Sequence, residues 1–150
     1  MTTSLRTEIR GYFNQIDPVG MMAVTLTLKK RVKGVWLDDI RASQNFRHFM
    51  NLLNSKVYGK RFKRFNKQLK VIPVMEMSAS NRLHFHLIIE VPTGCDYLWL
   101  QNEVKEIWGK TTFGYREIDI QKISDDGWTD YITKFRTKGD EVDWNNVHLN

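Results

Sequence analysis

Two histidines and one glutamate have the types and spacing of a metal site. His84 and His86 flank Phe85, and because side chains alternate along a strand, both imidazoles are expected on one face. Glu76 lies in the preceding predicted strand. If 79–81 form a three-residue hairpin loop, Glu76 lies opposite His84, with Cβ atoms about 5 Å apart. The three side chains could then bind one ion.

The loop length decides this arrangement. A two-residue loop would shift the register by one and turn Glu76 toward the core, where an unpaired carboxylate is costly. The three-residue loop is therefore favoured, and Asn81 tolerates the left-handed conformation that such a loop usually needs.

A His, His, carboxylate set with open positions suits a divalent ion that acts as a Lewis acid on a substrate oxygen. Imidazole ligands favour manganese, zinc or similar ions over magnesium, although magnesium is the abundant ion. We expect Mn²⁺ or Mg²⁺. The competing interpretation is that His84 and His86 belong to a solvated strand face and bind nothing. His48 and His148 are expected to be surface residues.

A tyrosine and a lysine near the C-terminus form a second candidate group. Tyr131 and Lys134 share one face of a predicted helix, because residues three apart are neighbours on a helix. A tyrosine phenol has a pKa near about 10 and is a poor nucleophile without nearby positive charge. Lys134 can supply that charge or neutralise a phosphate. The alternative is a tyrosine at the solvent boundary with no chemical role.

The net charge of +6 is concentrated in the segment 60–70. This segment has no acidic residue, and Phe62 and Phe65 are interleaved with its cations Lys60, Arg61, Lys63, Arg64, Lys67 and Lys70. Such a pattern suits a phosphate backbone whose bases are free to stack. The alternative is a solvated, lysine-rich connector.

Length and composition indicate one globular domain over residues 1–150. The 150 residues, 41% of them hydrophobic and 27% charged, can bury a core without cross-links. The single cysteine, Cys95, excludes an internal disulfide. We find no membrane-length apolar run and no signal-peptide core. The expected location is the cytoplasm of the host cell, or the nucleus if that host is eukaryotic.

Apolar alternation predicts four strands, over residues 22–29, 68–77, 83–91 and 115–123. Helical spacing and capping residues predict helices over 4–15, from the cap Ser43 to Val57, from the cap Asp96 to about Trp108, and from Asp125 or Asp126 to Gly139. Gly59 and Gly109 stand at the expected ends of the middle two helices. Residues 141–150 have no clear period and read as a tail or an edge extension.

This order of elements predicts an α+β fold close to the split βαβ, RRM-like or ferredoxin-like pattern. The sheet is expected to be mostly antiparallel, with helices on one face. Phe85 and the other apolar residues of its strand should point toward the helices. The opposite face, with His84 and His86, should stay open and carry the site.

Together these motifs resemble the catalytic domain of the His-hydrophobe-His (HUH) endonucleases. The closest similarity is to rolling-circle replication initiators (Rep proteins) of small viruses, phages and plasmids. That family has a Thr-Leu-containing first strand, a carboxylate strand, a two-histidine strand and a final Tyr-x-x-Lys helix. The corresponding residues are Val24-Thr25-Leu26-Thr27, Glu76, His84-Phe85-His86 and Tyr131-Ile132-Thr133-Lys134. The similarity covers nearly the whole chain.

Two features depart from the family pattern, and one common appendage is missing. The first strand lacks the aromatic residue and asparagine often found in its motif, and only Tyr131 stands on the last helix, which argues against a two-tyrosine mechanism. No Gly-x-x-x-x-Gly-Lys-Ser/Thr loop is present, so no attached helicase domain is expected.

The resemblance implies site-specific nicking and joining of single-stranded DNA. A metal held by Glu76, His84 and His86 would polarise the scissile phosphate, and Tyr131, assisted by Lys134, would attack it in line. The products would be a free 3′-hydroxyl, which primes replication, and a 5′-phosphotyrosine. Segment 60–70, together with Thr25 and Thr27, is expected to contact the DNA.

The implied partner is single-stranded DNA at a replication origin, which could include a flanking hairpin. A host helicase could be a further partner. No membrane partner is expected, and a monomer is the default.

Three other functions remain open at this point. A single-tyrosine transposase shares the order of motifs, although its tyrosine helix usually carries glutamine in place of lysine. A metal hydrolase could use the same triad to activate water, which would leave Tyr131 incidental. A non-catalytic RRM-like module would bind single strands through exposed aromatic residues, but Phe85 has the wrong parity for that. Conjugative relaxases are excluded because their tyrosine precedes the histidines.

Overall fold

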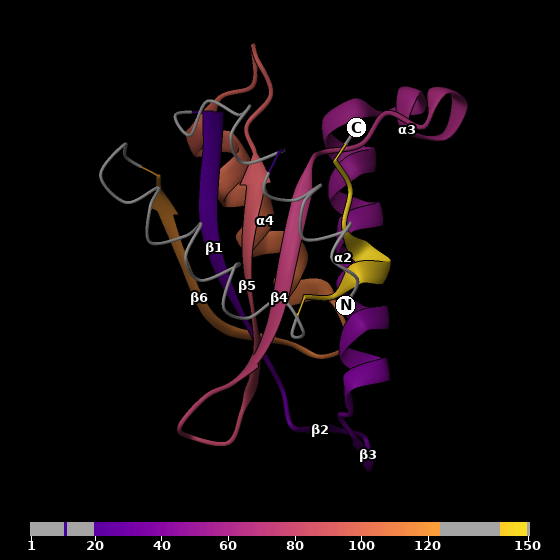
Figure 1. Cartoon of the computed structure of the whole chain (residues 1–150). Helices are drawn as coiled ribbons and strands as arrows, with labels where there is room; N and C mark the ends of the chain where they lie inside the picture. The colour runs from indigo at the N-terminus through magenta and orange to yellow at the C-terminus, as the bar shows by residue number, and fades with distance from the viewer. Residues whose placement is uncertain (1–10, 12–19, 124–141, 150) are drawn as a thin grey trace.

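A four-stranded antiparallel sheet forms the centre of the computed structural model, which describes residues 11, 20–123 and 142–149 (Figure 1). The strands lie in the order β4 (Val71–Met77), β5 (Leu83–Glu90), β1 (Met21–Leu28) and β6 (Gly114–Lys122). The α+β prediction and the four predicted strands are therefore confirmed. After β1, the short strands β2 (Arg31–Val32) and β3 (Val35–Trp36) form a separate hairpin.

Helices α2 (Asp39–Tyr58) and α4 (Tyr97–Lys110) pack against one face of this sheet (Figure 1). The predicted start of α2 is wrong: its cap is Asp38, whose Oδ1 accepts a hydrogen bond from the Arg41 amide at 2.7 Å. An aspartate side chain satisfies an orphan amide of the first turn, so the helix begins before the proposed Ser43 cap. Gly59 ends α2 as predicted, and its amide donates to the Ser55 carbonyl.

The second helix on this face begins as predicted and ends later than predicted. The carboxylate of Asp96 caps α4 by accepting from the Leu98 amide at 2.9 Å. Gly109 lies inside the last turn, and the C-cap is Thr111, whose hydroxyl donates to the Trp108 carbonyl at 2.6 Å. Shortly afterwards the chain passes so close to Trp108 that a Cβ at Gly114 would clash with the Trp108 carbonyl. A glycine is therefore needed where β6 begins.

The basic segment contains a helix that the sequence pattern did not predict. Residues Lys60–Phe65 form α3, directly after α2. Asn66 ends it in the left-handed conformation, with φ 53°. The cations of segment 60–70 are thereby split between a short exposed helix and an extended connector to β4.

The core between sheet and helices follows the predicted strand parity. Met22, Val24, Leu26 and Leu28 of β1 face α2 and α4, as do Phe85, Leu87 and Ile89 of β5. The rings of Phe46 and Phe85 lie 4.7 Å apart between their centroids. Burial of these side chains contributes about 1.5–3 kcal/mol each, which fixes β5 with its histidines turned away from the helices.

The opposite face is not fully open, contrary to the prediction. Ala23, Ile72, Val74 and Ile88 form a second apolar cluster there, with Val142 packed against them. The segment 142–149 covers this half of the face and includes the short helix η3 (Trp144–Asn146).

The C-terminal segment is an edge extension of the sheet. Val142 pairs with Val74 and His148 pairs with Val71, both on β4. The buried Asp143 accepts hydrogen bonds from the Ser43 hydroxyl at 2.9 and 3.0 Å. His148 is half-buried and not a surface residue as expected, whereas His48 is exposed.

The predicted helices over 4–15 and 125–139 fall on residues outside the described ranges, except for Gly11. Tyr131 and Lys134 lie in this part of the chain. Among the described helices, none has the length and apolar character needed to cross a membrane.

Candidate metal centre

The β4–β5 hairpin has the register that the sequence favoured. Glu76 lies opposite His84, and beyond the last strand pair the Ser78 amide donates to the Arg82 carbonyl at 2.9 Å. Asn81 has φ 60°, as a three-residue loop requires. Glu76 therefore lies on the same face as His84 and His86, as predicted.

Three potential ligand atoms converge on one point at this end of the hairpin. The Glu76 carboxylate oxygen Oε2 lies 2.7 Å from His86 Nε2 and 3.5 Å from His84 Nε2. The two Nε2 atoms are 2.7 Å apart, and the ring planes are nearly perpendicular, at 87°. One ligand atom from each residue fits within 4.8 Å of the others, so the three side chains form a candidate metal-binding group.

The chemistry of this donor set fits a divalent ion. Two imidazole nitrogens and one carboxylate oxygen are common ligands of catalytic metal sites, and three protein ligands leave positions for substrate or water. The side chains are between 14% and 27% exposed. Partial burial orients the ligands, while the remaining exposure leaves a path for a phosphate oxygen.

Thr25 on β1 supports one of the histidines from behind. It lies opposite His86 in the sheet, and its Oγ1 is 3.1 Å from His86 Nδ1. When the imidazole hydrogen is on Nδ1, that nitrogen donates to the Thr25 hydroxyl and the lone pair of Nε2 is directed toward Glu76. Thr25 was predicted to contact DNA; the structure places its hydroxyl against a candidate metal ligand. The cross-strand register was the signal that could have revealed this.

Thr27, also predicted to contact DNA, is buried opposite His84. Its carbonyl accepts a hydrogen bond from Trp108 Nε1 at 2.9 Å, which ties the sheet to α4 beneath the candidate ligands.

Two cationic side chains tie the hairpin to the end of β1. Arg82 donates to the Leu28 carbonyl at 3.1 Å, and its guanidinium lies 4.3 Å from the centre of the Tyr115 ring. Lys30 Nζ donates to the Ser80 carbonyl at 3.1 Å. These contacts hold the turn in place and put positive charge beside the candidate ligands.

The comparisons with known proteins give one match. Residues 21–140 match the family of the replication-associated protein ORF2. The chain belongs to this family. Its match spans the strand with Thr25, the candidate metal ligands and the region of Tyr131, and it confirms the interpretation of the chain as a rolling-circle Rep protein of the HUH type. No curated protein and no solved structure matches the chain.

The structure of this Rep family member separates the predicted residues into two places. Glu76, His84 and His86 meet at the hairpin, whereas segment 60–70 lies beside the other end of β5, where the Lys70 amide donates to Glu90 Oε1 at 3.0 Å. His86 and Glu90 are four residues apart along β5, about 13 Å at the usual strand rise. Tyr131 and Lys134 lie outside the described residues, so their roles remain predictions.

Proposed function

We propose that this Rep protein nicks and rejoins single-stranded DNA at a replication origin and so initiates rolling-circle replication. The observation that carries the proposal is the convergence of Glu76, His84 and His86 on one point in a chain of a replication-associated family. The same membership favours replication over transposition.

Glu76, His84 and His86 are the residues that would hold the metal. A bound Mn²⁺ or Mg²⁺ would supply Lewis-acid polarisation of the scissile phosphate. Thr25 keeps the imidazole of His86 in the orientation that presents Nε2. The carboxylate of Glu76 supplies the negative charge of the group.

Tyr131 is the proposed nucleophile. Its phenol oxygen forms a bond to the scissile phosphorus, and the bond from phosphorus to the 3′-oxygen breaks. The phenol loses its proton and the departing 3′-oxygen gains one, so no water is consumed. Lys134, three residues later on the predicted helix, would stabilise the phenolate or the developing charge on the phosphate.

The reverse reaction accounts for joining. The phosphotyrosine bond retains the energy of the phosphodiester, so a 3′-hydroxyl can attack it and restore the strand without ATP. During nicking, segment 60–70 would hold the phosphate backbone, since its cations are displayed on an exposed helix and connector. Residues 1–150 would act as one domain in this reaction.

The proposal is tested with a short single-stranded oligonucleotide that carries the origin, incubated with the protein and Mn²⁺ and separated on a denaturing gel. We expect a covalent protein–DNA band with the unmodified protein. The band should disappear in Tyr131→Phe and persist in Tyr97→Phe, a matched change on α4. Cleavage that survives in Tyr131→Phe would indicate a water-using hydrolase, and binding without cleavage in any variant would indicate an RRM-like binding module.

A further inference from the structure

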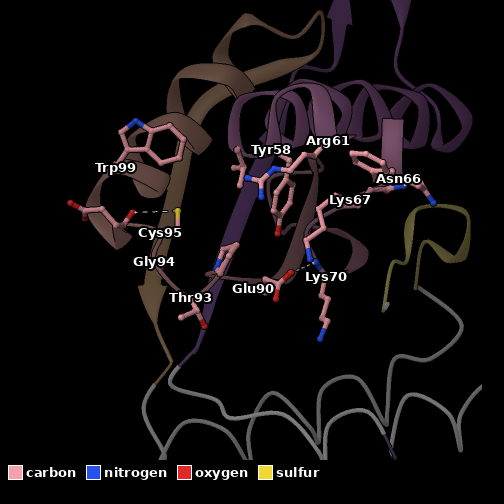
Figure 2. A pocket seen from close by; sticks show the side chains of 15 residues that line it. Tyr58, Arg61, Asn66, Lys67, Lys70, Glu90, Thr93, Gly94, Cys95 and Trp99 are labelled. Carbon is pink, nitrogen blue, oxygen red and sulfur yellow. Dashed lines mark hydrogen bonds between the residues drawn. The ribbon is translucent and has the colours of Figure 1, made fainter. Parts of the chain in front are cut away.

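A large pocket lies at the end of β5 opposite to the hairpin (Figure 2). It is bounded by α2, α3, the connector to β4 and the loop before α4, and its volume is about 920 Å³. Ligand pockets commonly range from about 300 to 1,000 Å³, so a nucleotide fits. None of the candidate metal ligands lines it.

One side of the pocket carries cations stacked on a tyrosine. The guanidinium of Arg61 and the ammonium of Lys67 lie 5.6 and 5.8 Å from the centre of the Tyr58 ring. Burial, and next the charge of Glu90, raise the pKa of the Tyr58 phenol above its usual value, so it stays a neutral hydrogen-bond donor at physiological pH. The cations can take backbone phosphates at this edge.

Aromatic side chains are exposed around the same pocket. Trp99 on the first turn of α4 is 39% exposed and Phe65 at the end of α3 is 75% exposed. Figure 2 shows Trp99 across the pocket from Arg61 and Lys67. Exposing an indole has a hydrophobic cost, and aromatic rings beside cations are the usual platform for unpaired bases.

The floor of the pocket carries a carboxylate. Glu90 accepts a hydrogen bond from the Lys70 amide at 3.0 Å through Oε1, which fixes its position (Figure 2). A carboxylate has about four lone-pair sites, so Glu90 can accept further hydrogen bonds from the pocket. An acceptor suits a base with an exocyclic amino group, such as cytosine, and is unsuitable for thymine, which presents a carbonyl there.

The position of the pocket favours a strand over a free nucleotide. Glu90 lies four residues after His86 on β5 and has the same strand parity, and the separation of about 13 Å corresponds to roughly four nucleotides of helical rise. A single strand whose phosphate reaches the candidate metal group can therefore also reach the pocket.

From these observations we infer that the pocket between α3 and the start of α4 binds one unpaired, amino-bearing base of the DNA strand. The base stacks on Trp99 and donates to Glu90, while Arg61 and Lys67 hold its phosphates. This inference rests on the proposed function for the identity of the ligand, single-stranded DNA. It adds a site that selects a base at a distance from the nicked phosphate.

The test measures binding of fluorescently labelled dC20 and dT20 by anisotropy, with the full chain and with EDTA present, so that nicking plays no part. We expect tighter binding of dC20. Trp99→Ala should weaken that binding by about tenfold or more, Trp99→Phe should retain most of it, and the matched control Leu98→Ala should bind normally. Leu98 is the neighbouring residue on α4, is 66% exposed and does not line the pocket.

Glu90→Gln gives a second measurement, because a glutamine side chain can still accept from the Lys70 amide but offers the pocket donor hydrogens. The ratio of dC20 to dT20 affinity should fall in this variant. Equal binding by Trp99→Ala and Leu98→Ala, an unchanged ratio in Glu90→Gln, or full competition by free dCMP at equal nucleotide concentration would each overturn the inference. Tyr131→Phe should bind both oligonucleotides normally, so a failure of the nicking proposal leaves this result readable.

Discussion

The two ends of β5 offer a comparison within one strand. At the hairpin end, three partly buried side chains place their ligand atoms within 4.8 Å of one another. At the other end, Glu90 lies in a pocket of about 920 Å³ whose cations and exposed aromatic residues come from several elements. The first end is small and converging, and the second is wide and distributed.

This difference matches two different physical tasks. Polarising a phosphate requires ligands held at fixed distances, and adjacent antiparallel strands in register provide that rigidity. Holding a flexible strand requires charge and stacking surfaces spread over a longer path. We therefore expect changes at the hairpin end to alter chemistry and changes at the pocket end to alter DNA affinity.

The largest expected effect comes from removing a candidate metal ligand. His84→Ala should lower the nicking rate by more than about a hundredfold, since it removes a ligand from the group that stabilises transition-state charge. Chelation of the unmodified protein should have the same result. Nicking is measured on the denaturing gel, and DNA binding by anisotropy in EDTA. A His84→Ala protein that loses binding along with nicking would break the comparison, because the two ends would then not be separable.

A smaller effect is expected from the support behind His86. Thr25→Val keeps the shape but removes the hydroxyl that contacts Nδ1, and the loss of such a partner usually costs about 10- to 100-fold in metal affinity. Calorimetric titration with Mn²⁺ measures the affinity directly, and the Mn²⁺ dependence of nicking should shift in parallel. Thr25→Ser, which retains the hydroxyl, serves as the control. If Thr25→Val binds Mn²⁺ as tightly as Thr25→Ser, the hydroxyl does not orient His86.

The smallest effect is expected from the exposed charges of α3. The double variant Lys60→Gln, Lys63→Gln should weaken DNA binding modestly and reduce the slope of log affinity against log salt by about 0.7 for each phosphate that is no longer neutralised. Lys105→Gln, Lys110→Gln on α4 makes the same charge change elsewhere and should leave the slope unchanged. The slope is obtained from anisotropy titrations at several salt concentrations. Equal slopes in the two double variants would mean that the overall charge, and not α3, attracts the strand.

Local sequence pattern was sufficient for the strands and for the metal group. Alternation in β5 put Phe85 on the helix side and His84 with His86 on the other, because a period of two assigns each residue to a face. The tolerance of Asn81 for φ 60° fixed the loop length and brought Glu76 opposite His84. These are short-range properties, which the order of residues contains.

The errors came from contacts between distant segments. The sheet face expected to be open is half covered, because the C-terminal segment pairs with β4 and places Val142 on Val74. Ser43 is not a cap; its hydroxyl donates to Asp143, a hundred residues away in the chain. Neither contact has a local signature, so no short-range pattern could reveal it.

The sequence by itself determined the α+β class, the faces of the strands and the identity of three candidate ligands, because alternation and turn chemistry act within a hairpin. Only the tertiary structure decided that Thr25 lies behind His86, since that contact depends on the pairing of β1 with β5, which are far apart in the chain. It also decided that the cations of α3, Glu90 and Trp99 meet in one pocket. These groups belong to separate elements, and packing of the helices on the sheet is what brings them together.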